Sequence, residues 1–166
     1  MKTLNGLALA AAIWSAPAAA RADHWTAVCS TGAVDEASSS HYAFTSAAFE
    51  YNAASVSLSP IVERVNVVNT FDNGTSPEQP GWTKLELTYT EAVASDVVAA
   101  SLYEVDPCTG TVELLCTATS AGAGTSCTSC TIPRVVDFAS HAYYVAVTVD
   151  RAATGNRPKC QMLRLY

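Results

Sequence analysis

The sequence predicts an all-β protein: a mostly antiparallel β-sandwich, with the jelly roll as one form of it, stabilised by disulfides. From about residue 55 onward, hydrophobic and polar residues alternate with a period of two, which is typical of strands with one buried and one wet face. Expected strands follow one another roughly every 8–14 residues, with no long amphipathic helix between them. Helix should therefore occupy less than about 15% of the chain. The third observation is a set of six cysteines.

The alternation assigns a buried face to each of the clearest segments. The residues expected in the core are Leu85, Leu87, Tyr89, Val112, Leu114, Val145 and Val147. The expected strands are 42–51, 56–58, 62–69, 83–90, 97–105, 112–118, 131–136, 143–150 and 160–166.

Residues 105–112 predict a hairpin. Asp106 can accept hydrogen bonds from the turn backbone, Pro107 presets φ, and Gly110 can adopt positive φ. Glycine-rich residues 120–126 and the longer segment 71–82 are expected to be loops, and a loop as long as the second is either functional or disordered.

The first 22 residues are typical of a signal peptide for export. Lys2 is followed by the apolar run 7–14, Pro17 breaks that run, and Ala20-Arg21-Ala22 fits a signal peptidase site. We expect a mature chain that starts at Asp23, give or take a few residues, with 23–166 as one domain. The apolar run is too short to span a bilayer. The predicted localisation is secreted, either extracellular or periplasmic, with no membrane association after processing.

The charge balance excludes some partners. Nine basic residues stand against fifteen acidic ones, for a net charge of −6, and removing residues 1–22 also removes Lys2 and Arg21. An acidic chain is a poor partner for nucleic acid or for anionic membranes.

The even number of cysteines in an exported domain predicts three disulfides among Cys29, Cys108, Cys116, Cys127, Cys130 and Cys160. Cys108 lies in the hairpin turn and Cys116 about 15 Å up the outgoing strand, so these two cannot pair. Cys29 and Cys160 lie near opposite ends of the mature chain, and we expect them to pair. Cys116 then pairs with Cys127 or Cys130, and Cys108 takes the other.

The strand and turn signatures of 102–112 and 142–149 resemble small secreted bacterial β-sandwich proteins of unassigned function. The resemblance covers residues 83–166. It implies the fold and carries over no functional residue.

Candidate ligand-binding residues are few. Trp25 and Trp82 could stack on a sugar ring, although large aromatics more often fill a core. Asp72 and Asn73 open a motif that is similar to the start of a calcium loop, but a plain turn explains it better. Asn73 also begins a glycosylation sequon. His24, His41 and His141 have no metal-site spacing, so no metal or other cofactor is expected.

No nucleophile motif or acid pair selects a catalytic site, so the protein is expected not to be an enzyme. The favoured function is a secreted, non-catalytic module, either structural or binding. Its candidate partners are a carbohydrate, a protein surface, or a second copy joined through a sheet edge. The alternative is a small hydrolase or metal-dependent enzyme whose site the fold assembles.

Overall fold

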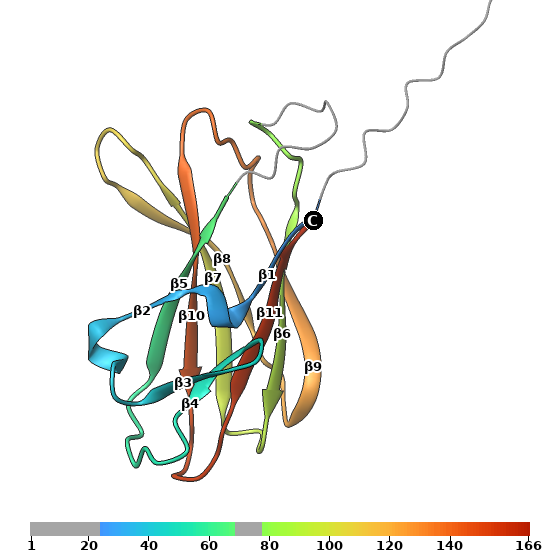
Figure 1. Cartoon of the computed structure of the whole chain (residues 1–166). Helices are drawn as coiled ribbons and strands as arrows, with labels where there is room; N and C mark the ends of the chain where they lie inside the picture. Colours follow the sequence, from blue (N-terminus) through green and yellow to red (C-terminus); the bar gives the residue numbers. More distant parts are fainter. Residues whose placement is uncertain (1–23, 69–77) are drawn as a thin grey trace, which may run out of the picture.

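A computed structural model describes residues 24–68 and 78–166 (Figure 1). Of these residues, 52% lie in strands and 4% in helical turns, which confirms the all-β prediction. The predicted signal peptide and cleavage site, as well as Asp72 and Asn73, lie outside the described residues. Among the described residues, no helix is long and apolar enough to cross a membrane.

Two antiparallel sheets face each other. The order in the six-stranded sheet is β3-β4-β11-β6-β9, with β1 also paired to β11. Its strands are β1 (Trp25–Val28), β3 (Tyr42–Thr45), β4 (Ala48–Tyr51), β6 (Lys84–Glu91), β9 (Gly124–Thr131) and β11 (Lys159–Leu165). The order in the five-stranded sheet is β2-β5-β10-β7-β8. Its strands are β2 (Ala33–Val34), β5 (Ile61–Val67), β7 (Val97–Val105), β8 (Val112–Thr119) and β10 (Ala142–Asp150). Short 3-10 turns η1 (Cys29–Thr31) and η2 (Glu36–Ser38) flank β2.

The strand order is that of a jelly roll. Strands β4 to β11 divide into β4-β11-β6-β9 and β5-β10-β7-β8, and every connection except the β7–β8 hairpin crosses between the sheets. Strands β8 and β9 therefore lie at the same side of the sandwich. At the opposite side, β1 and β4 of one sheet face β5 and β2 of the other.

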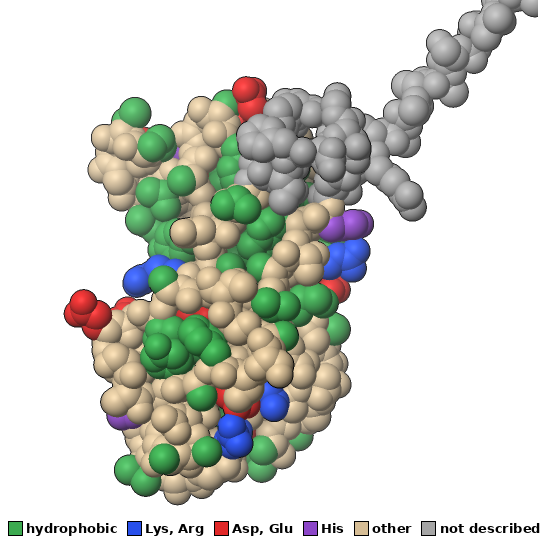
Figure 2. All heavy atoms as spheres, viewed as in Figure 1, with side chains coloured by type: hydrophobic (Ala, Val, Ile, Leu, Met, Phe, Trp, Pro, Cys, Tyr) green, Lys and Arg blue, Asp and Glu red, His purple; other side chains and the backbone are tan. Residues whose placement is uncertain are grey.

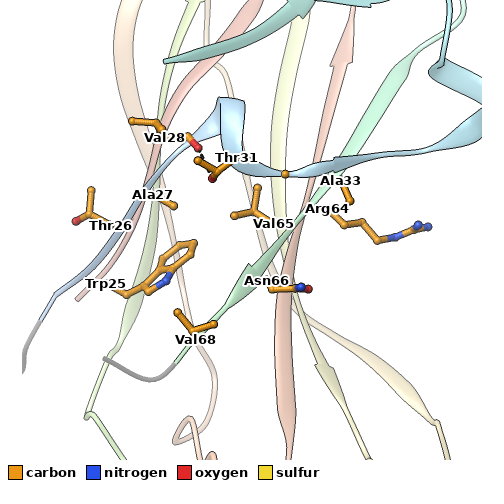
Figure 3. A pocket seen from close by; sticks show the side chains of 11 residues that line it. Trp25, Thr26, Ala27, Val28, Thr31, Ala33, Arg64, Val65, Asn66 and Val68 are labelled. Carbon is orange, nitrogen blue, oxygen red and sulfur yellow. Dashed lines mark hydrogen bonds between the residues drawn. The ribbon is translucent and has the colours of Figure 1, made fainter. Parts of the chain in front are cut away.

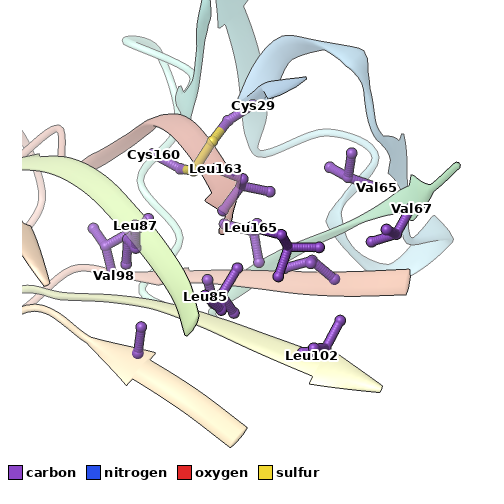
Figure 4. Packing of buried hydrophobic residues seen from close by; sticks show 14 of the residues in the cluster. Cys29, Val65, Val67, Leu85, Leu87, Val98, Leu102, Cys160, Leu163 and Leu165 are labelled. Carbon is purple, nitrogen blue, oxygen red and sulfur yellow. A yellow bond between two sulfur atoms is a disulfide. The ribbon is translucent and has the colours of Figure 1, made fainter. Parts of the chain in front are cut away.

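Inward residues of both sheets form one core, shown in part in Figure 4. Five of the seven residues expected there are buried: Leu85, Leu87, Tyr89, Val145 and Val147. The prediction is wrong for Val112 and Leu114, which are each 50% exposed. A β-bulge explains the error, because Leu102 pairs with Cys116 and Tyr103 with Leu114, leaving Leu115 as the extra residue. The bulge turns the first half of β8 over, so Leu115 is the buried residue there.

Three strand assignments need correction. The expected strand 131–136 is a loop after Thr131, and the strand in this region is β9, which includes residues 124–126 of the loop expected at 120–126. Residues 56–58 form no strand. The expected strand 42–51 is a hairpin, with Ser46 at φ 53° in the turn between β3 and β4.

The β7–β8 hairpin has the predicted chemistry. Asp106 Oδ1 accepts hydrogen bonds from the backbone N–H groups of Cys108 (2.8 Å) and Thr109 (3.1 Å). Gly110 has a φ of 71°, which favours glycine.

Two disulfides form. Cys29 bonds to Cys160 with a Cα–Cα distance of 5.7 Å, and Cys116 bonds to Cys130 at 5.9 Å. The expected third bond is absent, because Cys108 and Cys127 are free, exposed thiols. Cys127 pairs with Thr88 on the outer face of β9, whereas Cys108 is held in the β7–β8 turn, so the two thiols are on separate elements.

A buried arginine fixes the segment between β4 and β5. Arg151 donates hydrogen bonds to the carbonyl oxygens of Ser57 (2.8 Å) and Ser55 (2.7 Å). Its guanidinium also lies 4.3 Å from the ring centroid of Tyr51, a cation–π contact.

Candidate functional site

A lateral pocket of about 630 Å³ opens between β1, η1 and β5 (Figure 3). Trp25 and Ala27 of β1 face Val65 of β5 and the adjacent Val68 across it. These side chains make an apolar wall, and Val68 is largely exposed. The pocket lies on the side of the sandwich where the two sheets are not joined by Cys116–Cys130.

The rim of the lateral pocket carries polar groups. Arg64 and Asn66 project from the outward face of β5, and the Arg64 side chain is 55% exposed, with only a 3.7 Å contact to Asp35. Within the described ranges, the Asn66 amide has no hydrogen-bond partner. Strand β2 pairs with β5 only at Glu63 and Arg64, so within the part of the chain that the structure describes no strand pairs with residues 65–67 on the edge of β5 beside the pocket. These amide, guanidinium and backbone groups can bind a polar ligand.

A row of side chains continues from Asn66 across the outer face of the five-stranded sheet. Asn66 is opposite Tyr144, Tyr144 is opposite Tyr103, and Tyr103 is opposite Leu114. The two tyrosine rings are stacked, with centroids 5.0 Å apart and an interplanar angle of 15°. We call these four residues the tyrosine row. Because the stacked ring faces cover each other, the row presents ring edges and hydroxyl groups outward.

Figure 2 shows the molecule from the same side as Figure 1. Hydrophobic side chains are spread over this side of the molecule, while Lys, Arg, Asp and Glu side chains are few and scattered.

A second hollow of about 630 Å³, the acidic pocket, lies at the β7–β8 hairpin and the 132–141 loop. Its charged residues are Glu104, Asp106, Glu113, Arg134, Asp137 and His141.

These charged groups are already partnered. Arg134 lies 3.0 Å from Glu104 and 2.6 Å from Glu113, and Tyr143 donates to Glu104 at 2.9 Å. Burial raises the pKa of Tyr143 to about 12, so it remains a donor. The backbone N–H groups of Cys108 and Thr109 lower the pKa of Asp106.

One arrangement in the acidic pocket resembles a catalytic series. Ser140 Oγ is 2.8 Å from His141 Nδ1, and His141 Nε2 is 3.6 Å from Glu104 Oε1. Ser140 and His141 are consecutive residues, however, and Glu104 is held by Tyr143 and Arg134. We therefore assign these contacts a structural role in holding the 132–141 loop on β7.

The structure separates the residues that the sequence singled out. Trp25 is 3% exposed and contributes the edge of a wall, so it has no free face for a stacked sugar. Trp82, 2% exposed, packs edge-on against Phe138 in the core. The histidines lie apart: His24 contacts Tyr166, His41 contacts Ser55, and His141 belongs to the acidic pocket.

Sequence reasoning missed Tyr103, Tyr144, Arg64 and Asn66. Each of them occupies an outward position of a predicted strand, where a small polar residue would be ordinary. That contrast was the signal available in the sequence. Their alignment depends on strand order and register, which no local pattern specifies.

No family model and no curated protein matches the chain. One similar solved structure is the CBM36-1 domain of a multidomain xylanase from the hindgut metagenome of Trinervitermes trinervoides. The alignment has 9% identity and a TM-score of 0.48, and covers 87% of this chain and 97% of that domain. Another is that of infectious bursal disease virus, Gx strain, with 14% identity and a TM-score of 0.36, covering 86% of this chain and 31% of that one. Both are weak likenesses that establish no family.

Proposed function

We propose that this protein is a secreted, non-catalytic binding module, and that the lateral pocket and the tyrosine row together bind a carbohydrate chain. The supporting observation is the position of Asn66, which lies both at the rim of the lateral pocket and at one end of the tyrosine row. Here an apolar pocket with an unpartnered amide at its rim continues into a row of tyrosines. Sugars combine apolar ring faces with many hydroxyls, and binding sites for such ligands pair apolar walls with a few polar groups.

The lateral pocket fits this ligand better than the acidic pocket does. In the lateral pocket, Asn66 and Arg64 can form new hydrogen bonds without breaking existing ones. In the acidic pocket, a ligand would have to displace Arg134 from Glu104 and Glu113, leaving buried charge unpaired.

A glycan array followed by calorimetry with the retained glycans tests this proposal. We expect Asn66→Ala and Arg64→Ala to weaken binding by roughly tenfold each, as the loss of a hydrogen bond to ligand predicts. Arg134→Ala is the matched control, since it removes the same charge from the other pocket. Tyr144→Ala should weaken binding of long oligosaccharides more than that of short ones, because the row lies beyond the pocket.

Two results would reject the proposal. An array that retains no glycan removes the carbohydrate ligand, and a loss of binding in Arg134→Ala alone moves the site to the acidic pocket. Chromatography of the glycan after incubation should show it unchanged, since cleavage would point to the hydrolase alternative.

A structural role has one specific observation in its favour. Strand β9 is an edge strand of eight residues, Gly124–Thr131, without a charged residue or a proline. Such an edge lacks the usual protection against pairing with another chain. Assembly through β9 predicts dimers or larger species in analytical ultracentrifugation that Thr128→Lys abolishes.

A further inference from the structure

Glu63 is a carboxyl group fully enclosed in the sandwich. It lies on the inward face of β5, is 0% exposed, and among the described residues has no side-chain hydrogen-bond partner or ion pair, the backbone N–H of Gly32 being the polar group that approaches it. A buried carboxylate without an ion-pair partner is strongly unfavourable, so a group of this kind calls for a proton or a cation beside it.

The neighbours of Glu63 are the sulfurs of the Cys29–Cys160 disulfide. One carboxylate oxygen and the two Sγ atoms all lie within 4.8 Å of one another, and all three residues are buried. Figure 4 shows the disulfide beside Leu163, where η1 meets β11. The three side chains thus come from three elements that the fold brings together around one point.

We propose that Cys29, Cys160 and Glu63 form a buried binding site for a thiophilic divalent cation such as Zn²⁺ when the disulfide is reduced. Two thiolates and one carboxylate are a donor set that zinc accepts, at about 2.3 Å for sulfur and about 2.0–2.2 Å for oxygen. Donor atoms around one tetrahedral ion are then roughly 3.5 Å apart, so the two sulfurs have to separate once their bond is broken, while the carboxylate oxygen already lies within 4.8 Å of both. A fourth position remains for water.

The same three residues therefore have two exclusive states. A dithiol reductant supplies two electrons and two protons, which break the S–S bond and leave a thiol on each cysteine, while the reductant becomes a disulfide. The cation then displaces the two thiol protons and any proton on Glu63. A small-molecule disulfide can act as the oxidant in the reverse direction: it takes two electrons from the two thiolates and becomes two thiols, while the S–S bond re-forms and the cation is released. None of these three residues lines the lateral pocket, although η1 and β5 contribute to both sites.

Cobalt titration of the purified, reduced protein tests the inference, with a phosphine as reductant. We expect one equivalent of Co²⁺ to produce thiolate-to-cobalt absorption, and Zn²⁺ to displace it. Glu63→Gln should weaken Co²⁺ binding by at least about tenfold, since one of three protein donors is lost. Glu91→Gln is the matched control: it alters another buried glutamate, whose oxygen bonds Ser120 and Val98 instead of facing a cysteine.

Two double variants distinguish the proposed site from the other cysteines of the chain. Cys116→Ser/Cys130→Ser should still bind cobalt, whereas Cys29→Ser/Cys160→Ser should not. If the reduced chain unfolds without metal, Zn²⁺ should raise its Tm in the wild type and fail to do so in Glu63→Gln. The inference is overturned by equal binding in wild type and Glu63→Gln, by binding that survives loss of Cys29 and Cys160, or by a reduced wild type that neither binds cobalt nor gains Tm.

Discussion

A β-carbon placed on Gly32 would lie 2.5 Å from Oε2 of Glu63 and 3.0 Å from the carbonyl oxygen of Arg64. The φ of Gly32 is −78°, which any residue can adopt, so the requirement for glycine here is one of space. The backbone of η1 and β2 therefore closes directly over the buried carboxyl group.

Gly32→Ala should destabilise the protein by ~1–3 kcal/mol, because a methyl group is forced into a packed site. In a Glu63→Ala background the space is open, and the cost of Gly32→Ala should fall. A double-mutant cycle measured by urea unfolding checks this coupling. If the stability costs of the two substitutions are additive, the carbonyl oxygen of Arg64, and not the side chain of Glu63, limits the space around Gly32.

Glu63 should make stability depend on pH in the disulfide-bonded protein. Burial raises the pKa of Glu63 from 4.5 to about 8, against a smaller opposite effect of the Gly32 backbone N–H. The folded protein therefore holds a proton that the unfolded chain has lost between these pH values, and stability falls as pH rises from about 4.5 to about 8. The total loss is ~4–5 kcal/mol at about 1.4 kcal/mol per unit. In urea unfolding without reductant, Glu63→Gln should lack this loss, and parallel pH curves for the two proteins would contradict the prediction.

Arg151→Met should cost ~2–4 kcal/mol, because it strips the carbonyl oxygens of Ser55 and Ser57 of a charged donor and removes the cation over Tyr51. Limited proteolysis should then cut the segment 52–60. The control is Arg164→Met, whose guanidinium lies 5.1 Å from the ring centroid of the half-exposed Tyr166. Its cost should stay below about 1 kcal/mol, and equal costs for the two variants would argue against the bridging role of Arg151.

The two disulfides should differ in their contribution to stability. Cys29–Cys160 joins residues 131 apart and Cys116–Cys130 residues 14 apart, so the chain-entropy model gives ~4–5 and ~3 kcal/mol. Paired Cys→Ser variants, compared by denaturant unfolding, test the order. Iodoacetamide applied to the native protein without reductant should label Cys108 and Cys127 only. If it labels neither, these two cysteines form the third disulfide that the sequence predicted.

Local patterns predicted much of the fold, since strands such as β6 and β10 alternate in a way that only a half-buried strand explains. Tertiary context decided the rest. Strand β9 is composed of Gly, Thr, Ser and Cys, a composition typical of a loop, and pairing with β6 makes it a strand. Val112 and Leu114 were misplaced because a bulge is invisible in the alternation of a single strand.

The candidate site was harder to predict than the fold. Trp25 was singled out for its type, and the structure places it at the lateral pocket but almost covered. Asn66, Tyr144 and Tyr103 come from three strands, and they meet only because β10 lies between β5 and β7. Likewise, the contact of Glu63 with Cys29 and Cys160 depends on the packing of one sheet against the other.

The Cys116–Cys130 disulfide links the two sheets covalently at one side of the sandwich. This bond fixes the spacing of the edge strands β8 and β9 on one side, whereas on the opposite side only backbone connections within the described residues, such as η1 and the β4–β5 segment, run between the sheets. We therefore expect the two sheets to separate most at β1 and β5. This separation widens the lateral pocket, while the sheets stay together at β8 and β9. Amide hydrogens of β1 and β2 should therefore exchange with solvent well before those of β7 and β10.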